Sequence, residues 1–112
     1  MKWKITFFST TVEKETFSFP KKILAKLIHI FDIIEEHGPN IGQPYTDSFG
    51  DGLFEVRAKA EEGIGRSLFC YTKGKEIIIL HSFIKKTQKT PKKELDVALK
   101  RKKEIDHEIN KT

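Results

Sequence analysis

The chain has 112 residues, a formal net charge of +5 at pH 7 and a single cysteine, Cys70. This length suits one domain, which we expect to span residues 1–112, and one cysteine excludes an intrachain disulfide and favours a reducing compartment. No segment approaches the roughly 20 apolar residues of a membrane span and no signal peptide is visible, so we expect a cytoplasmic protein with no membrane partner.

The first half of the chain predicts one strand and one long helix. Residues 3–8 are aromatic and β-branched, which is typical of a strand, and residues 11–18 predict a short helix or a polar connection. A longer helix begins at Pro20, where the missing N–H costs nothing, and ends at Gly38. Its predicted apolar face comprises Ile23, Leu24, Leu27, Ile28, Phe31 and Ile34. Residues 40–52 hold three glycines and a proline, which predicts a loop.

Three strands are predicted next. Residues 53–60 alternate in polarity, and residues 64–72 and 75–83 each follow a short polar turn that contains glycine. Turns of this length favour antiparallel pairing of neighbouring strands. The run at 77–80 is continuously apolar, which predicts a central strand that is buried on both faces.

The end of the chain predicts a helix that Thr90 caps and Pro91 opens. Its apolar stripe comprises Leu95, Ala98, Leu99, Ile105 and Ile109. The predicted order of elements is therefore βααβββα. Three consecutive strands with the helices set apart favour the α+β class over a parallel doubly wound sheet.

Two arginines lie inside predicted strands. If the strands that carry Arg57 and Arg66 form a hairpin, both side chains project from the sheet near the partner strand. Two guanidinium groups on one sheet face can clamp a phosphate. The alternative is an ordinary ion pair at the solvent face with a carboxylate such as Glu55 or Glu61.

Two other side chains stand at strand ends. His81 is a candidate acid or base because its ordinary pKa is about 6.5; the alternative is a histidine satisfied by a backbone carbonyl. Tyr71 is a candidate for stacking on a base or holding a proton; the alternative is a cap on the edge of the core. Cys70 lies in an apolar run, which predicts a buried, inert thiol. The four histidines lack zinc-like spacing, and no phosphate loop or nucleophilic triad is present, so we expect no metal.

The net charge is concentrated near the end of the chain. Residues 1–80 hold eleven basic and eleven acidic residues, whereas residues 81–112 hold ten basic and five acidic ones. Residues 85–93 alone carry five lysines and no acid. Such a block attracts a polyanion, or it is a solvated face rich in lysine.

Three motifs together resemble a known family. The runs at residues 52–57, 66–69 and 80–91, together with Glu94 and Arg101 in the last helix, resemble the phage-derived Gp49-like branch of the RelE/HigB toxins within the RelE/ParE superfamily. The resemblance covers about residues 3–105. One position departs from the pattern: Ser82 stands where glycine usually follows the histidine, and serine is small enough to keep the strand end.

The resemblance implies a small α+β toxin of a toxin–antitoxin pair. Two N-terminal helices would pack on a mostly antiparallel sheet of about four strands, and a helix would end the chain. Such toxins typically cleave mRNA, often in the ribosomal A site, and an antitoxin that commonly has a helix-turn-helix domain neutralises them. We therefore expect mRNA, the ribosome and a cognate antitoxin as partners, and no cofactor.

The resemblance also assigns roles by motif. Arg57 and Arg66 become the sheet arginines that stabilise charge on a phosphoryl group, while an RNA 2′-hydroxyl attacks the neighbouring phosphorus in line without a metal. The candidates for proton transfer are Lys85, Lys86, His81 and Tyr71. The lysines expected to grip backbone phosphates are Lys59, Lys89, Lys92 and Lys93.

Two other functions fit the same residues. Related ParE-type toxins inhibit DNA gyrase instead of cutting RNA, and a non-enzymatic phage module would bind nucleic acid without chemistry. The lysine-rich motif favours RNA.

Overall fold

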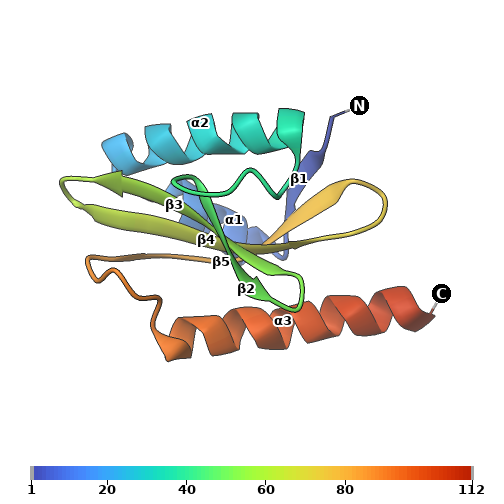
Figure 1. Ribbon diagram of the computed structural model, residues 1–112. Helices are drawn as coiled ribbons and strands as arrows, with labels where there is room; N and C mark the ends of the chain where they lie inside the picture. Colours follow the sequence, from blue (N-terminus) through green and yellow to red (C-terminus); the bar gives the residue numbers. More distant parts are fainter. Residues whose placement is uncertain (1, 112) are drawn as a thin grey trace.

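The computed structural model describes residues 2–111, with side chains described for residues 2–108. It contains three helices and one five-stranded sheet (Figure 1). The elements are β1 (Lys4–Phe7), α1 (Thr10–Phe17), α2 (Lys21–His37), β2 (Thr46–Gly50), β3 (Leu53–Ala60), β4 (Gly63–Tyr71), β5 (Glu76–Lys85) and α3 (Lys92–Lys111). The predicted α+β class and the predicted strands are confirmed.

The sheet has the strand order β1-β5-β4-β3-β2. Neighbours pair antiparallel, except that β1 runs parallel to β5. The prediction of a mostly antiparallel sheet is therefore confirmed. The apolar run of β5 lies inside the sheet, where Ile77, Ile79 and Leu80 are fully buried.

The strand count differs from the prediction because β2 lies within the expected loop. It pairs with the first half of β3, with Thr46 opposite Val56, and a bulge precedes Gly50. Of its five residues only Thr46 is buried. An edge strand that is exposed on both faces shows no apolar alternation, so its pairing leaves no pattern in the sequence.

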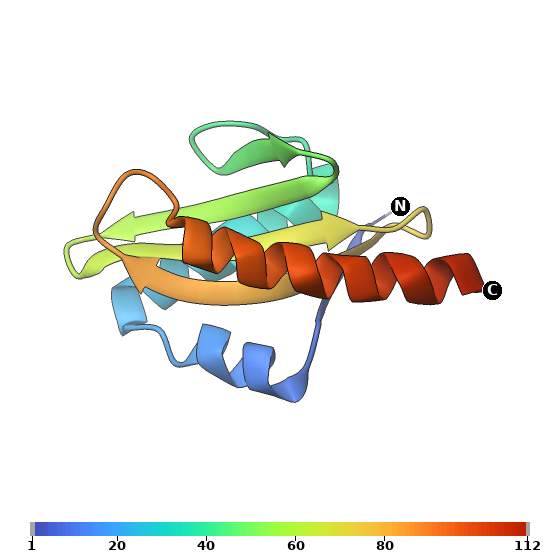
Figure 2. The same cartoon turned by 90° about the horizontal axis from the view of Figure 1, so that it is seen from below.

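The helices cover both faces of the sheet. α1 and α2 pack on one face and α3 on the other (Figure 2). The side of α2 toward the sheet buries Ile23, Leu27, Ile30, Phe31 and Ile34. Ile28, which was predicted to belong to this face, is 41% exposed, because it lies at the flank of the stripe. None of the helices within residues 2–111 is long and apolar enough to cross a bilayer.

The helix α3 buries Ala98 and packs Leu95 and Ile105 against the second core cluster. Leu99, which was predicted to belong to the stripe, is 38% exposed. The side chain of Ile109 lies outside the described residues. The α3 stripe is therefore narrower than predicted.

The ends of α1 and α2 are stabilised by nearby residues of the chain, whereas the predicted cap of α3 is absent. Ser9 caps α1 by accepting a hydrogen bond from the Val12 N–H at 3.2 Å, and Gly38 ends α2 with a φ of 91°. The prediction that Thr90 caps α3 is wrong. Its hydroxyl donates to Glu55 instead, and the Pro91 carbonyl accepts the first helical hydrogen bonds.

A chain of three buried hydroxyls joins α1 to the sheet. Thr16 Oγ1 lies 2.7 Å from Ser82 Oγ, which lies 2.8 Å from Ser67 Oγ. Ser82 and Ser67 are cross-strand partners on β5 and β4. The serine that replaces the usual glycine is therefore a hydrogen-bonding partner for α1.

We expect Thr16→Val to lower the free energy of unfolding by about 1 kcal/mol, because it removes a buried hydrogen bond while keeping the side-chain shape. Thr11→Val, at an exposed position of the same helix, is the matched control. Denaturant unfolding measures both. Equal stabilities of the two variants would contradict a stabilising role for the hydroxyl chain.

Candidate active site

The register of β3, β4 and β5 gathers basic side chains on one face. Arg57 lies directly opposite Arg66, and Arg66 lies opposite Phe83. The neighbours of Phe83 on the same face of β5 are His81 and Lys85. Each of them is therefore a diagonal neighbour of Arg66, and diagonal cross-strand pairs have Cα atoms about 7–8 Å apart. Phe83 belongs to the core cluster beneath α3. The predicted pairing of the two arginines on one sheet face is therefore confirmed, and this face is the one that α3 covers.

Arg66 is fully buried. Its Nη2 donates to the Thr87 carbonyl and to the Gln88 carbonyl, the latter at 3.1 Å, whereas its Nε and Nη1 have no hydrogen-bond partner among the described residues. Burial lowers the pKa of the Arg66 guanidinium, the charge of Glu55 opposes this shift, and the charge of Arg57 adds to it. A guanidinium nevertheless stays protonated in proteins, so the site holds a buried positive charge.

Arg57 is partly exposed and held from two sides. Its Nε donates to Glu55 Oε1 at 2.7 Å, and its Nη2 donates to the Gln88 carbonyl. Glu55 is fully buried and also accepts from the Thr90 hydroxyl at 2.7 Å. The ion pair with Glu55 that was considered for Arg57 is therefore present, and it lies inside the arginine site instead of at the solvent face.

His81 is paired with a carboxylate. Its Nε2 donates to Glu94 Oε1 at 2.9 Å, and its ring stacks on Phe83 with centroids 5.4 Å apart. The alternative of a backbone carbonyl partner is therefore wrong. With Nε2 bonded to a carboxylate, Nδ1 is the free nitrogen of the neutral ring, and it is buried without a partner among the described residues.

A β-bulge turns His81 toward this face. Leu68 pairs with His81 and Phe69 pairs with Ile79, so Leu80 is an extra residue in β5. Leu80 also belongs to the core beneath α3, and its carbonyl accepts a hydrogen bond from Arg101 Nη1 at 2.7 Å. Sequence reasoning missed this bulge, and it missed Glu94 as the partner of His81.

Two lysines, Lys59 and Lys85, lie on strands beside the arginine pair. Arg57 and Lys59 line a cavity of about 270 Å³ together with Gln88 and with Asp47 of β2. Lys85 ends β5 on the arginine face. The remaining lysines of the block are exposed in the connection to α3 or in its first turn; these are Lys86, Lys89, Lys92 and Lys93.

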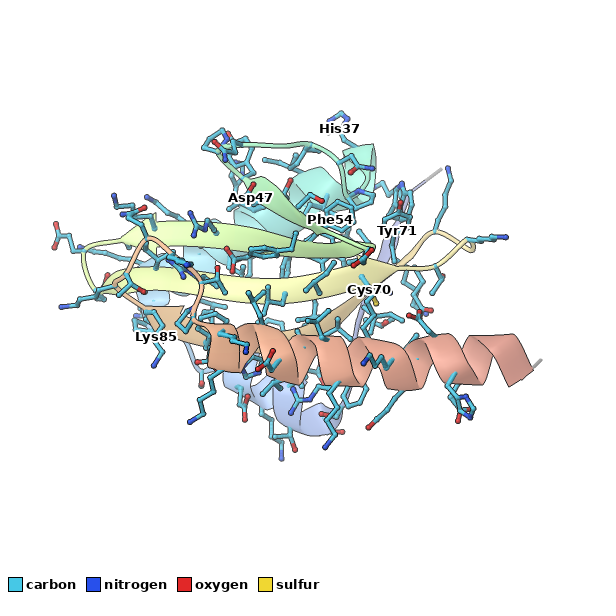
Figure 3. The ribbon with its side chains drawn as sticks, turned by 60° about the horizontal axis from the view of Figure 1, so that its bottom comes forward. His37, Asp47, Phe54, Cys70, Tyr71 and Lys85 are labelled. Atoms are coloured by element: carbon cyan, nitrogen blue, oxygen red, sulfur yellow. The ribbon has the colours of Figure 1, made fainter. Side chains whose placement is uncertain are left out.

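Tyr71 is not brought into this cluster. Figure 3 shows Tyr71 and Lys85 at opposite ends of the sheet. Tyr71 lies five positions after Arg66 in β4, which is about 17 Å along a strand. Tyr71 is 42% exposed and packs edge-on to Trp3 with ring centroids 5.6 Å apart. This placement matches the alternative in which Tyr71 caps the edge of the core.

The residues of this sheet face could bind an anion and transfer a proton. Two guanidinium groups and several ammonium groups attract phosphate, and the pair of His81 and Glu94 can move a proton. Cys70 is buried as predicted, and burial raises the pKa of its thiol to about 11, so the thiol stays protonated at neutral pH. Among the side chains that the structure describes, no group of three or more metal-ligating residues comes together.

Comparison with known proteins gives one family and one fold. The family described as phage-derived protein Gp49-like matches residues 14–103. A double arginine-to-alanine mutant of the Escherichia coli toxin RelE in its free state has a TM-score of 0.66 at 11% identity, over 90% of this chain and 98% of that chain. A chain of the archaeal RelE–RelB complex from Pyrococcus horikoshii OT3 has a TM-score of 0.54 at 22% identity, over 75% of this chain and 96% of that chain. No curated protein sequence matches.

We expect Glu55→Ala to lower the free energy of unfolding by about 3 kcal/mol or more, because it leaves two guanidinium groups without their buried counter-charge. Chemical denaturation measures the change. Glu61→Ala, in the exposed turn between β3 and β4, is the control and should stay within about 0.5 kcal/mol of the original chain. A small effect at both positions would show that Glu55 does not hold the arginines in place.

Proposed function

Because this chain belongs to the phage-derived Gp49-like family, we propose that it is the toxin of a type II toxin–antitoxin system and acts as an mRNA endoribonuclease. The fold supports this proposal, since it resembles that of the E. coli toxin RelE and of a chain of the P. horikoshii RelE–RelB complex. In the proposal the toxin acts in the cytoplasm, where it cleaves mRNA in the ribosomal A site. A cognate helix-turn-helix antitoxin neutralises it.

One observation supports the proposal: three cationic side chains share a sheet face with a histidine that is paired with a carboxylate. Arg57, Arg66 and Lys85 come from three adjacent strands and share one face with His81. Cleavage of a phosphodiester needs positive groups where negative charge develops and a group that moves protons. This face carries candidates for both roles, which supports the proposal.

The proposed reaction is an in-line displacement. The 2′-hydroxyl oxygen of the RNA forms a bond to the adjacent phosphorus while the bond from phosphorus to the 5′-oxygen breaks. Arg66 and Arg57 donate hydrogen bonds to the non-bridging oxygens, which gain negative charge in the transition state. The products are a 2′,3′-cyclic phosphate and a new 5′-hydroxyl, and no metal takes part.

Two proton transfers complete the step. His81 Nδ1 accepts the proton of the 2′-hydroxyl, while Glu94 accepts the Nε2 hydrogen bond and stabilises the imidazolium that forms. Lys85 or Lys86 gives a proton to the departing 5′-oxygen. Lys59, Lys89, Lys92 and Lys93 grip phosphates along the message. Tyr71 has no role in this mechanism.

Expression of the gene tests the proposed function. We expect the expressed gene to inhibit growth and to produce new 5′-hydroxyl ends inside messages. We also expect a chelator to leave RNA cleavage by the purified protein unaffected. DNA damage without such ends would favour a gyrase inhibitor, and no growth defect would favour a non-enzymatic module. Co-expression of the neighbouring gene should restore growth if that gene encodes the antitoxin.

We expect Arg66→Ala to abolish growth inhibition, because loss of one positioned charge donor lowers a rate by about 10²–10³-fold. Circular dichroism checks that the variant stays folded, and Arg66→Met serves as a second variant that keeps the apolar stem. Tyr71→Phe, at the far end of the sheet, is the control and should remain fully toxic. A folded Arg66→Ala variant with full toxicity would contradict the role of this residue.

We expect the double substitution Lys85→Ala and Lys86→Ala to weaken RNA binding in a salt-dependent way. Each lost phosphate contact reduces the slope of log K against log salt by about 0.7 for a single strand, so two contacts reduce it by about 1.4. Titration of a fluorescent single-stranded RNA at several salt concentrations measures the slope. Lys73→Ala with Lys103→Ala removes the same charge at exposed positions outside the site, and its slope should stay closer to that of the original chain.

A further inference from the structure

Residues 86–90, here called the cap, cross the sheet face that carries the arginine pair before α3 begins (Figure 2). The carbonyls of Thr87 and Gln88 accept hydrogen bonds from Arg66, and the Gln88 carbonyl also accepts from Arg57. Arg66 is fully buried as a result. The two guanidinium groups best suited to a phosphate are therefore occupied by the chain itself.

The cap carbonyls occupy the positions that phosphoryl oxygens would take. A guanidinium donates in the same fork geometry to a carbonyl and to a phosphate. A phosphodiester oxygen carries formal negative charge, and hydrogen bonds between charged partners are roughly twice as strong as neutral ones. A phosphodiester therefore competes well with the Thr87 and Gln88 carbonyls for Arg57 and Arg66.

The closed site leaves hydrogen-bonding capacity unused. The buried side-chain polar atoms that lack a partner within the described residues are Arg66 Nε, Arg66 Nη1 and His81 Nδ1. All three lie on the face that the cap and α3 cover. Buried polar groups in folded proteins are almost always paired, so this concentration points to a ligand that brings several acceptor oxygens.

The attachment of the cap to the sheet is polar. Residues 86–90 form no helix or strand and add no side chain to either hydrophobic cluster. Four of the five residues are exposed, and Thr90 is the exception. Its hydroxyl donates to the buried Glu55 at 2.7 Å. Opening the cap therefore exposes little apolar surface and breaks few contacts.

We propose that the cap is a displaceable lid. It covers the sheet face that carries the arginine pair until an RNA phosphodiester replaces the Thr87 and Gln88 carbonyls as the partner of the arginines. The hydrogen bond from Thr90 to Glu55 is the latch of this lid. The inference rests on the proposed function, because it assigns the ligand class from it. A lid of this kind reduces the apparent affinity for RNA by the fraction of molecules that are open.

Removing the latch while keeping its shape tests the lid. Thr90→Val should bind a short 2′-O-methyl RNA, which lacks the attacking hydroxyl, roughly tenfold more tightly, since a hydrogen bond to a charged group is lost only from the closed state. Thr90→Ser should restore the original affinity. Thr11→Val is the matched control, because Thr11 is exposed on α1, which packs on the other face of the sheet, and it should leave the affinity unchanged. Equal or weaker binding by folded Thr90→Val overturns the proposal.

A second measurement needs no variant. Phenylglyoxal modifies accessible guanidinium groups, and mass spectrometry resolves Arg66 from Arg101, which contacts the sheet outside the cap. Arg66 of the original chain should react much faster than the protein unfolds globally, and the 2′-O-methyl RNA should suppress this reaction. Reaction of Arg66 only at the rate of global unfolding shows a fixed segment and overturns the lid.

The two proposals fail in different ways. If Thr90→Val binds RNA more tightly and exposes Arg66, but no variant yields cleaved RNA ends, the lid stands and the endoribonuclease proposal fails. If the original chain cleaves RNA while Thr90→Val shows unchanged binding and unchanged labelling of Arg66, the enzyme stands and the lid fails.

Discussion

The antiparallel register of β3, β4 and β5 is the constraint on which the site depends. It sets Arg57 opposite Arg66 and brings Lys85 and His81 to the same face. A slip of one residue would turn every side chain of a strand to the other face. Short turns limit that slip, and so does Gly65 in β4, where a Cβ atom would lie 2.3 Å from Ile23 of α2. The packing of the core thus places the basic groups.

The sheet face that carries Arg57 and Arg66 combines a charge arrangement that destabilises the sheet with one that suits the binding of a phosphate. Like charges directly opposite each other on neighbouring strands destabilise a sheet. The buried carboxylate of Glu55 is paired with Arg57, and it acts on Arg66 through its charge alone. The carbonyls of Thr87 and Gln88 accept hydrogen bonds from both guanidinium groups, although Arg66 Nε and Nη1 have no partner among the described residues. A partner that is supplied by a short polar segment can be exchanged for a ligand, whereas a second buried carboxylate would neutralise the arginines and repel a phosphate.

Sequence patterns predicted the features that arise from local rules. Alternation and turn chemistry gave β3, β4 and β5, and because neighbours across a short turn pair antiparallel, Arg57 and Arg66 were expected on one face. The partnership of His81 with Glu94 was not predictable, since it depends on a bulge and on the path of the chain into α3. Thr90 was assigned to the helix by its local context, but the buried charge of Glu55 competes better for its hydroxyl. Tertiary partners decided these cases, and no local pattern encodes them.

The start of α3 also carries charges that are unfavourable for the stability of the helix. The N-terminal end of a helix is partly positive and favours acidic side chains, yet Lys92 and Lys93 occupy the first turn, where Glu94 is the acidic residue. The Glu94 carboxylate accepts a hydrogen bond from His81, and it is a single negative charge against the two lysines. The helix end, the two lysines and the arginine pair have the same sign of charge. Such an arrangement costs helix stability and attracts a polyanion, and it lies in the part of the chain after residue 80, where the net positive charge is concentrated.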